Sequence, residues 1–259
     1  MKWLTKTLES IVRRLDRSWR APGVQVLFAS QVPGLIAVTG LMAALGVYVM
    51  FRRPESISNV AFVLGIIVSL ALTRGAVGGD RRASRWAVLF QLPVTPLRFY
   101  FRTLAIRLVF ATTLIAAASL VWGLALPFTE LPPRALFASV VVTWVGTLVL
   151  VVLGFSLACV VRVREQSALL LMFVVSVLQK ALLHGWGLDV IPFAEVVLLY
   201  TLFPVDPLFD LLRVLATGGP WNGAAAVGQV GFTLAFWLAI AAARLQYFAR
   251  SDLPLALED

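Results

Sequence analysis

Long apolar runs separated by short basic segments constrain this chain more than any other feature of its sequence. Of its 259 residues, 60% are hydrophobic and only 14% are charged, whereas soluble domains have about 45–50% apolar and about 25% charged residues. A soluble core would not hide so many apolar runs, so the excess must face lipid. Because lipid offers the backbone no hydrogen-bonding partner, the runs must be helices. The sequence therefore predicts an all-α integral membrane protein.

Six apolar runs reach the length of about 17–25 residues that a helix needs to cross a membrane. They lie at residues 32–51, 57–73, 104–126, 135–161, 167–183 and 223–245. The first run begins only near Val32, after a charged stretch, so we expect no secretory signal peptide. The chain has no internal repeat and no linker composition. It is therefore predicted to form one multi-pass membrane domain over residues 1–259.

The basic residues predict how the chain is oriented. The formal net charge is +9, and an excess of Lys and Arg marks the cytoplasmic loops of membrane proteins. With a cytoplasmic N-terminus, sixteen Lys and Arg lie inside, five lie outside, and Arg107 lies just within the third span. This distribution predicts N-in and C-in topology. It also argues against a nucleic-acid partner, because no basic stripe is interleaved with stacking aromatic residues.

Two segments on the predicted cytoplasmic side do not cross. Residues 1–31 contain a Trp/Leu stripe opposite basic residues, which predicts a helix lying in the membrane interface and contacting lipid; a helix packed on a partner is the alternative. Residues 74–103 predict a helix–break–helix elbow. Pro93 stops its first helix, and Thr95 caps the next, which has Pro96 at its first position.

Residues 184–222 form a third segment, on the predicted external side. Its composition is too apolar for a free loop, so we expect two short helices before the last span that either dip partly into the membrane or cover the external mouth. In the second of these, Asp206 is predicted to be the N-cap and Pro207 the first helical residue. Gly218-Gly219 is predicted to end it.

Sequence patterns for catalysis and for metal binding are missing. The chain has no phosphate-binding Gly-x-x-x-x-Gly-Lys-Ser/Thr run. The single Cys159 is expected to pack as a small hydrophobe, and the single His184 fits no zinc spacing. Gly154-Phe155-Ser156 lacks the glycine that follows a hydrolase serine, so helix packing explains it better. We expect no catalytic residue, no metal and no cofactor bound by this chain itself.

Polar residues within apolar spans are the remaining candidates for a substrate path. Lys180, near the outer end of the fifth span, either contacts an anionic substrate or extends to the outer interface. Gln229 lies early in the last span and is the second candidate. Arg107 is expected to reach the inner headgroups. Glycines in the spans, among them Gly46 and Gly65, are expected to permit close helix approach.

The elbow resembles a known family. Its residues read Gly79-Asp80-Arg81-Arg82-Ala83-Ser84-Arg85-Trp86 and then Leu89-Phe90-Gln91-Leu92-Pro93-Val94-Thr95-Pro96. This resembles the ABC-2 type family of ABC transporter permeases, in which a charged stretch after the second span leads to a Leu-x-x-x-Pro-Val-Ser/Thr turn. The segment Leu202-Phe203-Pro204-Val205-Asp206-Pro207-Leu208 is similar to that family's segment before the last span. Asp80 and Asp206 depart from the usual Glu and Asn, and Arg98 and Arg102 stand where a lysine is common.

The resemblance implies an exporter subunit in the inner (plasma) membrane of a bacterium. Two six-span subunits would form a dimer, with a second copy or a paralogue, and separate ABC ATP-binding subunits would hold ATP and Mg²⁺. The elbow would be the coupling helix that contacts the ATPase. Its contact residues would be Arg82, Arg85, Trp86, Leu89 and Phe90. The alternative is that this face rests on the membrane surface.

Two other classes of protein remain open at this point. A non-catalytic scaffold or assembly subunit of a larger membrane complex would have the same spans. A membrane enzyme acting on lipid-linked substrates would need convergent acidic or His residues in the spans, and these are missing. The apolar spans favour an amphipathic or hydrophobic cargo if the chain transports one.

Overall fold

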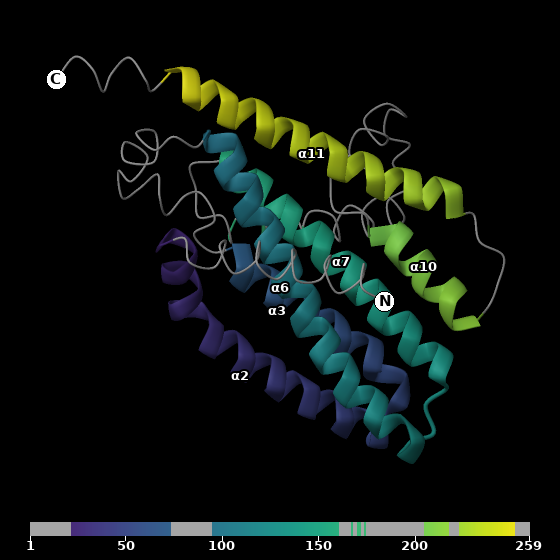
Figure 1. Cartoon of the computed structure of the whole chain (residues 1–259). Coiled ribbons are helices and arrows are strands. Elements are labelled where there is room, and N and C mark those ends of the chain that lie inside the picture. The colour runs from purple at the N-terminus through teal and green to yellow at the C-terminus, as the bar shows by residue number, and fades with distance from the viewer. Residues whose placement is uncertain are drawn as a thin grey trace, which may run out of the picture. The chain divides into compact units, whose positions relative to one another are not determined.

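A computed structural model of the chain describes residues 22–73, 95–160, 205–217 and 223–251, with positions 167, 170, 171 and 174. Within these ranges all regular structure is helical (Figure 1). The chain divides into two units, residues 1–38 and 39–259. The first unit contains the beginning of helix α2, and the other described helices belong to the second.

The described helices have the following bounds. In chain order they are α2 (Pro22–Arg52), the 3₁₀ turn η1 (Pro54–Ser56), α3 (Ile57–Thr73), α6 (Pro96–Ala125), the 3₁₀ turn η2 (Leu126–Phe128), α7 (Pro133–Val160), α10 (Val205–Thr217) and α11 (Gly223–Ser251).

Five of the described helices are long and apolar enough to cross a membrane. Their apolar stretches are Gly34–Arg52, Pro54–Thr73, Leu97–Phe128, Pro133–Val160 and Val227–Tyr247. These stretches coincide with five of the six predicted spans, so the chain is a multi-pass membrane protein. The predicted span 167–183 lies mostly outside the described residues, as do residues 1–21 of the predicted interfacial segment.

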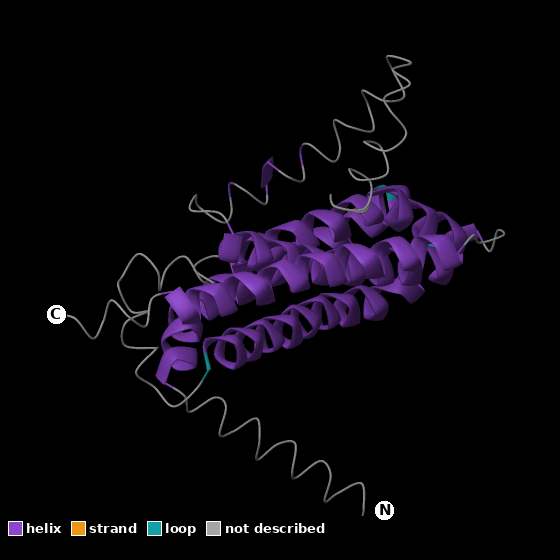
Figure 2. Ribbon diagram, turned by 90° about the horizontal axis from the view of Figure 1, so that it is seen from above, coloured by secondary structure: helices purple, strands orange, loops and turns teal. Residues whose placement is uncertain are grey.

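Helix α7 is the centre of the second unit. It packs against α3, α6, α10 and α11, which are labelled around it in Figure 1. Figure 2 shows described helices lying side by side. Its composition is apolar on every side, and a helix of that kind is stable where all its faces are covered. Accordingly, every residue from Val151 to Cys159 is buried. Leu208 of α10 belongs to one hydrophobic cluster with Leu153 and Leu157 of α7, and Trp237 of α11 packs against that cluster.

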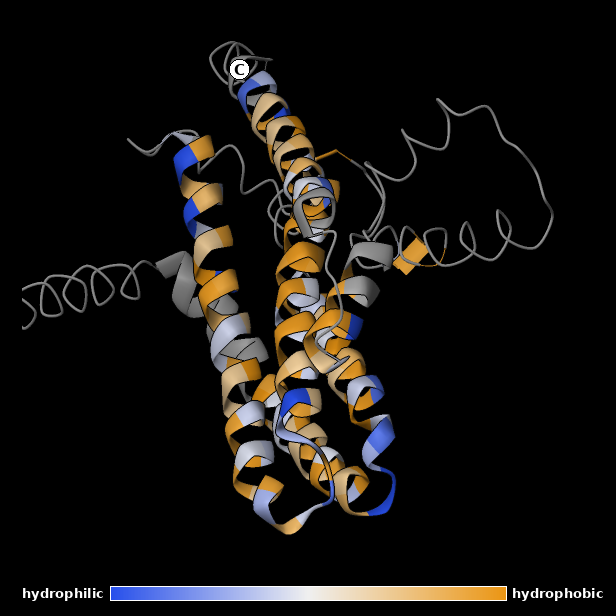
Figure 3. Ribbon diagram, turned by 90° about the vertical axis from the view of Figure 1, so that its right-hand side faces the viewer, coloured by the Kyte–Doolittle hydropathy of each residue, from blue (hydrophilic) through white to orange (hydrophobic). Residues whose placement is uncertain are grey.

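The outward faces of the helices are apolar. Leu41 in α2, Leu120 and Leu124 in α6 and Phe232 in α11 are all more than half exposed. Figure 3 shows apolar residues along the middle of the helices and most hydrophilic residues near their ends. Exposed apolar area of this extent is rare on soluble monomers. It suits helices surrounded by lipid, where the backbone is satisfied within each helix.

Two of the predicted helix starts differ in detail from the structure. Helix α6 begins at Pro96 after Thr95, as predicted, but the Thr95 side chain makes no capping hydrogen bond; only its carbonyl accepts, from the Phe99 N–H at 3.1 Å. Helix α10 begins at Val205, so the prediction of Asp206 as the cap is wrong. Pro207 is the third helical residue, where a missing N–H costs little because the first four N–H groups have no intrahelical partner.

Candidate functional site

The structure describes only one of the residues that the sequence proposed for a site. Arg82, Arg85, Trp86, Leu89 and Phe90, together with Lys180, lie outside the described residues. Gln229 lies in α11, where it is partly buried. It is not among the residues that line the two cavities described below.

Arg107 joins the two helices on either side of the predicted elbow. It lies in α6 and is 5% exposed, and its Nη1 donates a hydrogen bond to the carbonyl oxygen of Leu72, in the last turn of α3. The prediction that Arg107 reaches the headgroups is therefore wrong. A guanidinium in an apolar environment is stabilised by a strong acceptor, and a main-chain carbonyl near a helix C-terminus provides one. The arginine thus fixes α6 against α3.

A seam of small and hydroxyl residues holds α3 against α7. Ser69 Oγ donates to the Gly65 carbonyl at 2.7 Å and makes a longer contact of 3.4 Å with the Thr147 carbonyl across the interface. Thr147 Oγ1 donates to Thr143 O in its own helix at 2.7 Å. These hydroxyls are satisfied, and the absence of a side chain at Gly65 lets the two backbones approach.

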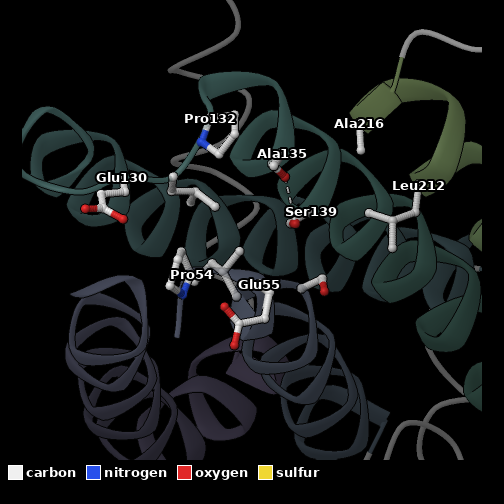
Figure 4. A pocket seen from close by; sticks show the side chains of 11 residues that line it. Pro54, Glu55, Glu130, Pro132, Ala135, Ser139, Leu212 and Ala216 are labelled. Atoms are coloured by element: carbon white, nitrogen blue, oxygen red, sulfur yellow. Dashed lines mark hydrogen bonds between the residues drawn. The ribbon is translucent and has the colours of Figure 1, made fainter. Parts of the chain in front are cut away.

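A cavity of about 410 Å³ opens where α3, α7 and α10 come together (Figure 4). Pro54, Glu55, Ile57 and Ser58 form its wall at the start of α3. Residues of the turn and first helical turns of α7 form the opposite wall, namely Glu130, Leu131, Pro132, Ala135 and Ser139. Leu212 and Ala216 of α10 complete it. Its volume falls within the range of about 300–1,000 Å³ that small-molecule sites occupy.

The interior of this cavity is apolar, and its charges lie at the opening. Ile57 and Leu131 are buried, and Ser139 Oγ donates to the Ala135 carbonyl in its own helix at 2.8 Å, the dashed line in Figure 4. The hydroxyl is therefore satisfied. Glu55 and Glu130 are exposed, and they are the two charged residues of the lining. Such a cavity can hold an apolar group, and the carboxylates at its opening can attract a cationic group.

A second, more open hollow lies between α6 and α7. Its volume is about 470 Å³, and Ile115, Leu120 and Val140 are among its lining residues. Trp144 Nε1 donates to Thr112 Oγ1 at 3.1 Å on its wall. Because Leu120 is 70% exposed, this hollow faces the surroundings of the bundle. It has the character of a lipid-facing groove.

Sequence reasoning did not single out Glu55 or Glu130. A signal was present, because both are acidic residues next to prolines in the short connections between apolar runs, at Pro54-Glu55 and Glu130-Leu131-Pro132. Among the described residues, no group of three His, Cys, Asp or Glu side chains is placed to hold a metal ion. Cys159 is buried.

No protein-family model matches the chain, and no curated protein matches it either.

Proposed function

We propose that this chain is the membrane-spanning permease subunit of an ATP-driven ABC exporter. The observation that carries the proposal is the elbow sequence at residues 79–96, which resembles the coupling segment of ABC-2 type permeases. The described helices support it, because α3 reaches Thr73 and α6 begins at Pro96, on either side of this segment. The short helix α10 and the long helix α11 follow in the order that the family would have.

The buried contact between Arg107 and Leu72 supports the same proposal. It ties α6 to the last turn of α3, so the two helices that lead into and out of the elbow are joined within the bundle. A push on the elbow by an ATPase would then reach both helices together. In this mechanism the chain binds no nucleotide. ATP and Mg²⁺ are held by a separate subunit, and two permease chains form the path at the inner membrane.

The test is affinity purification of the tagged chain from its native membranes in mild detergent, with identification of copurifying proteins and an assay of ATP hydrolysis. The test variant is Trp86→Ala/Phe90→Ala. The matched control is Phe137→Ala/Trp144→Ala, which removes the same two side-chain types from exposed positions on α7. We expect a phosphate-loop ATPase to copurify with the wild-type chain and the control, and to be lost from the test variant.

Two other results would change the proposal. If no ATPase copurifies and other membrane proteins do, the chain is a scaffold or assembly subunit. If an ATPase copurifies equally with both variants, the chain is an exporter subunit, but the elbow is not its coupling site.

A further inference from the structure

We infer that the cavity between α3, α7 and α10 binds a zwitterionic phospholipid, with its ammonium group at Glu55 and Glu130. The inference goes beyond the proposed function and does not depend on it, because it concerns equilibrium binding to the chain alone. It rests on the depth of the cavity in the membrane, on its apolar interior and on the arrangement of charges at its opening.

The depth follows from the ends of the spans. The apolar stretch of α2 ends at Arg52 and the next begins at Pro54; likewise one ends at Phe128 and the next begins at Pro133. Pro54 and Pro132, from these two connections, line the same cavity. Both connections therefore lie at one end of the bundle, at the level where the hydrocarbon region gives way to the headgroups. A ligand bound at this level is surrounded by phospholipid.

The two carboxylates supply the attraction for an ammonium group. Glu55 and Glu130 are exposed, and neither forms a salt bridge within the described part of the chain. Both lie near helix N-termini, whose partial positive charge of about half a unit each favours a carboxylate. That partial charge offsets about half of the two full negative charges, so the opening remains attractive to a cation.

Four exposed arginines lie near lining residues in the sequence and are outside the lining itself. Arg52 and Arg53 precede Pro54, Arg134 follows the Pro132-Pro133 pair, and Arg213 follows Leu212. All four are exposed. Guanidinium groups bind phosphate well, and in a zwitterionic phospholipid the phosphate joins the glycerol to the ammonium group. A lipid with its glycerol region in the cavity therefore presents both its phosphate and its ammonium group at the opening.

The apolar wall accommodates the hydrophobic part of the ligand. Ile57, Leu131 and Leu212 face the cavity, and its volume of about 410 Å³ holds part of an acyl chain or the glycerol region. Contact with these side chains removes apolar surface from the polar headgroup layer, which is favourable. The site thus has one polar and one apolar end, as an amphiphile requires.

The experiment compares two short-chain lipids that share a phosphate and differ in the ammonium group. Dihexanoylphosphatidylethanolamine and dihexanoylphosphatidylglycerol are titrated into the full chain in a non-ionic detergent, and binding is followed by thermophoresis. We expect the ethanolamine lipid to bind the wild-type chain more tightly. Glu55→Gln/Glu130→Gln should weaken its binding by about threefold to thirtyfold and abolish the preference, because each exposed ion pair contributes modestly.

A second pair of variants tests whether the lipid enters the cavity. Ala216→Leu fills space at the lining, whereas Thr217→Leu changes the next residue on α10, which is exposed and outside the lining. Only Ala216→Leu should weaken binding of the ethanolamine lipid. The assignment is overturned if the wild-type chain binds the glycerol lipid equally or more tightly, or if the two α10 variants behave alike. If Ala216→Leu does not fold, the binding of the ethanolamine lipid to Glu55→Gln/Glu130→Gln tests the assignment instead.

Discussion

The indole of Trp122 occupies the space that a side chain at Gly46 would need. A Cβ built on Gly46 lies 2.5 Å from Trp122 Cε2 and 2.9 Å from Cζ2, and real Cβ contacts are longer. The indole is fully buried, and its Nε1 donates to the Ala43 carbonyl at 3.0 Å, one turn before Gly46. The glycine and the hydrogen bond together fix α6 against the second half of α2.

This relationship predicts the effect of adding one methyl group. Gly46→Ala should lower the free energy of unfolding by about 1–3 kcal/mol, because the large ring cannot move without losing its hydrogen bond. The measurement is the midpoint of thermal unfolding of the purified chain in detergent. An unfolding midpoint equal to that of the wild-type chain would show that the Trp122 indole can adopt another position without loss of stability.

Gly40 provides the control on the same helix. A Cβ at Gly40 meets no atom within 4 Å, and the residue is exposed. Gly40→Ala should therefore be neutral or should stabilise the helix by up to about 1 kcal/mol, because alanine has the higher helix propensity.

The bond between Arg107 and Leu72 gives a second prediction. Arg107→Met keeps most of the apolar stem but removes the donor to a buried carbonyl. The expected loss of stability is about 1–3 kcal/mol, again measured by thermal unfolding in detergent. Arg98→Met is the control, because Arg98 is exposed on the same helix and such substitutions change stability by about 0.5 kcal/mol or less. Equal midpoints for the two variants would mean that the buried bond contributes nothing.

A double-mutant cycle tests the seam between α3 and α7. A Cβ at Gly65 would lie 2.6 Å from Thr147 Oγ1 and 3.1 Å from Thr143 Cγ2. Gly65→Ala alone should destabilise the chain, whereas Gly65→Ala in the Thr147→Ala background should cost less. The coupling energy should fall in the range of about 0.5–3 kcal/mol for residues in contact. If the two substitutions change the free energy of unfolding additively, Gly65 and Thr147 are not energetically coupled.

The sequence was sufficient to find five of the helices and the start of α6, because apolar length and a Thr-Pro pair are local signals. It could not distinguish Gly46 from Gly40. Both lie in the same apolar run, and the difference is the distant Trp122, which faces one of them.

The same limit applies to the polar residues. The sequence predicts Arg107 at the headgroups because it shows how far Arg107 lies from the end of the span. It does not show that the Leu72 carbonyl lies beside the Arg107 side chain. Glu55 and Glu130 are separated in the sequence by two spans, and only the packing of α3, α7 and α10 brings them to one cavity. The sequence predicts the start of α10 two residues too late, with Asp206 as the cap and Pro207 as the first helical residue. The Asp-Pro signal is local, whereas α10 begins at Val205.

The number of crossings can be decided by cysteine labelling. Cys159 is the single native cysteine, and it is buried, so Cys159→Ala gives a background without reactive thiols. In that background we place either Glu130→Cys or Ala256→Cys. If residues 167–183 cross the membrane, an even number of spans puts Ala256 on the side opposite Glu130. A membrane-impermeant maleimide should then label only Glu130→Cys in intact cells and should label both variants in permeabilised cells. Labelling of both variants in intact cells would reduce the crossings to five and place the C-terminus outside.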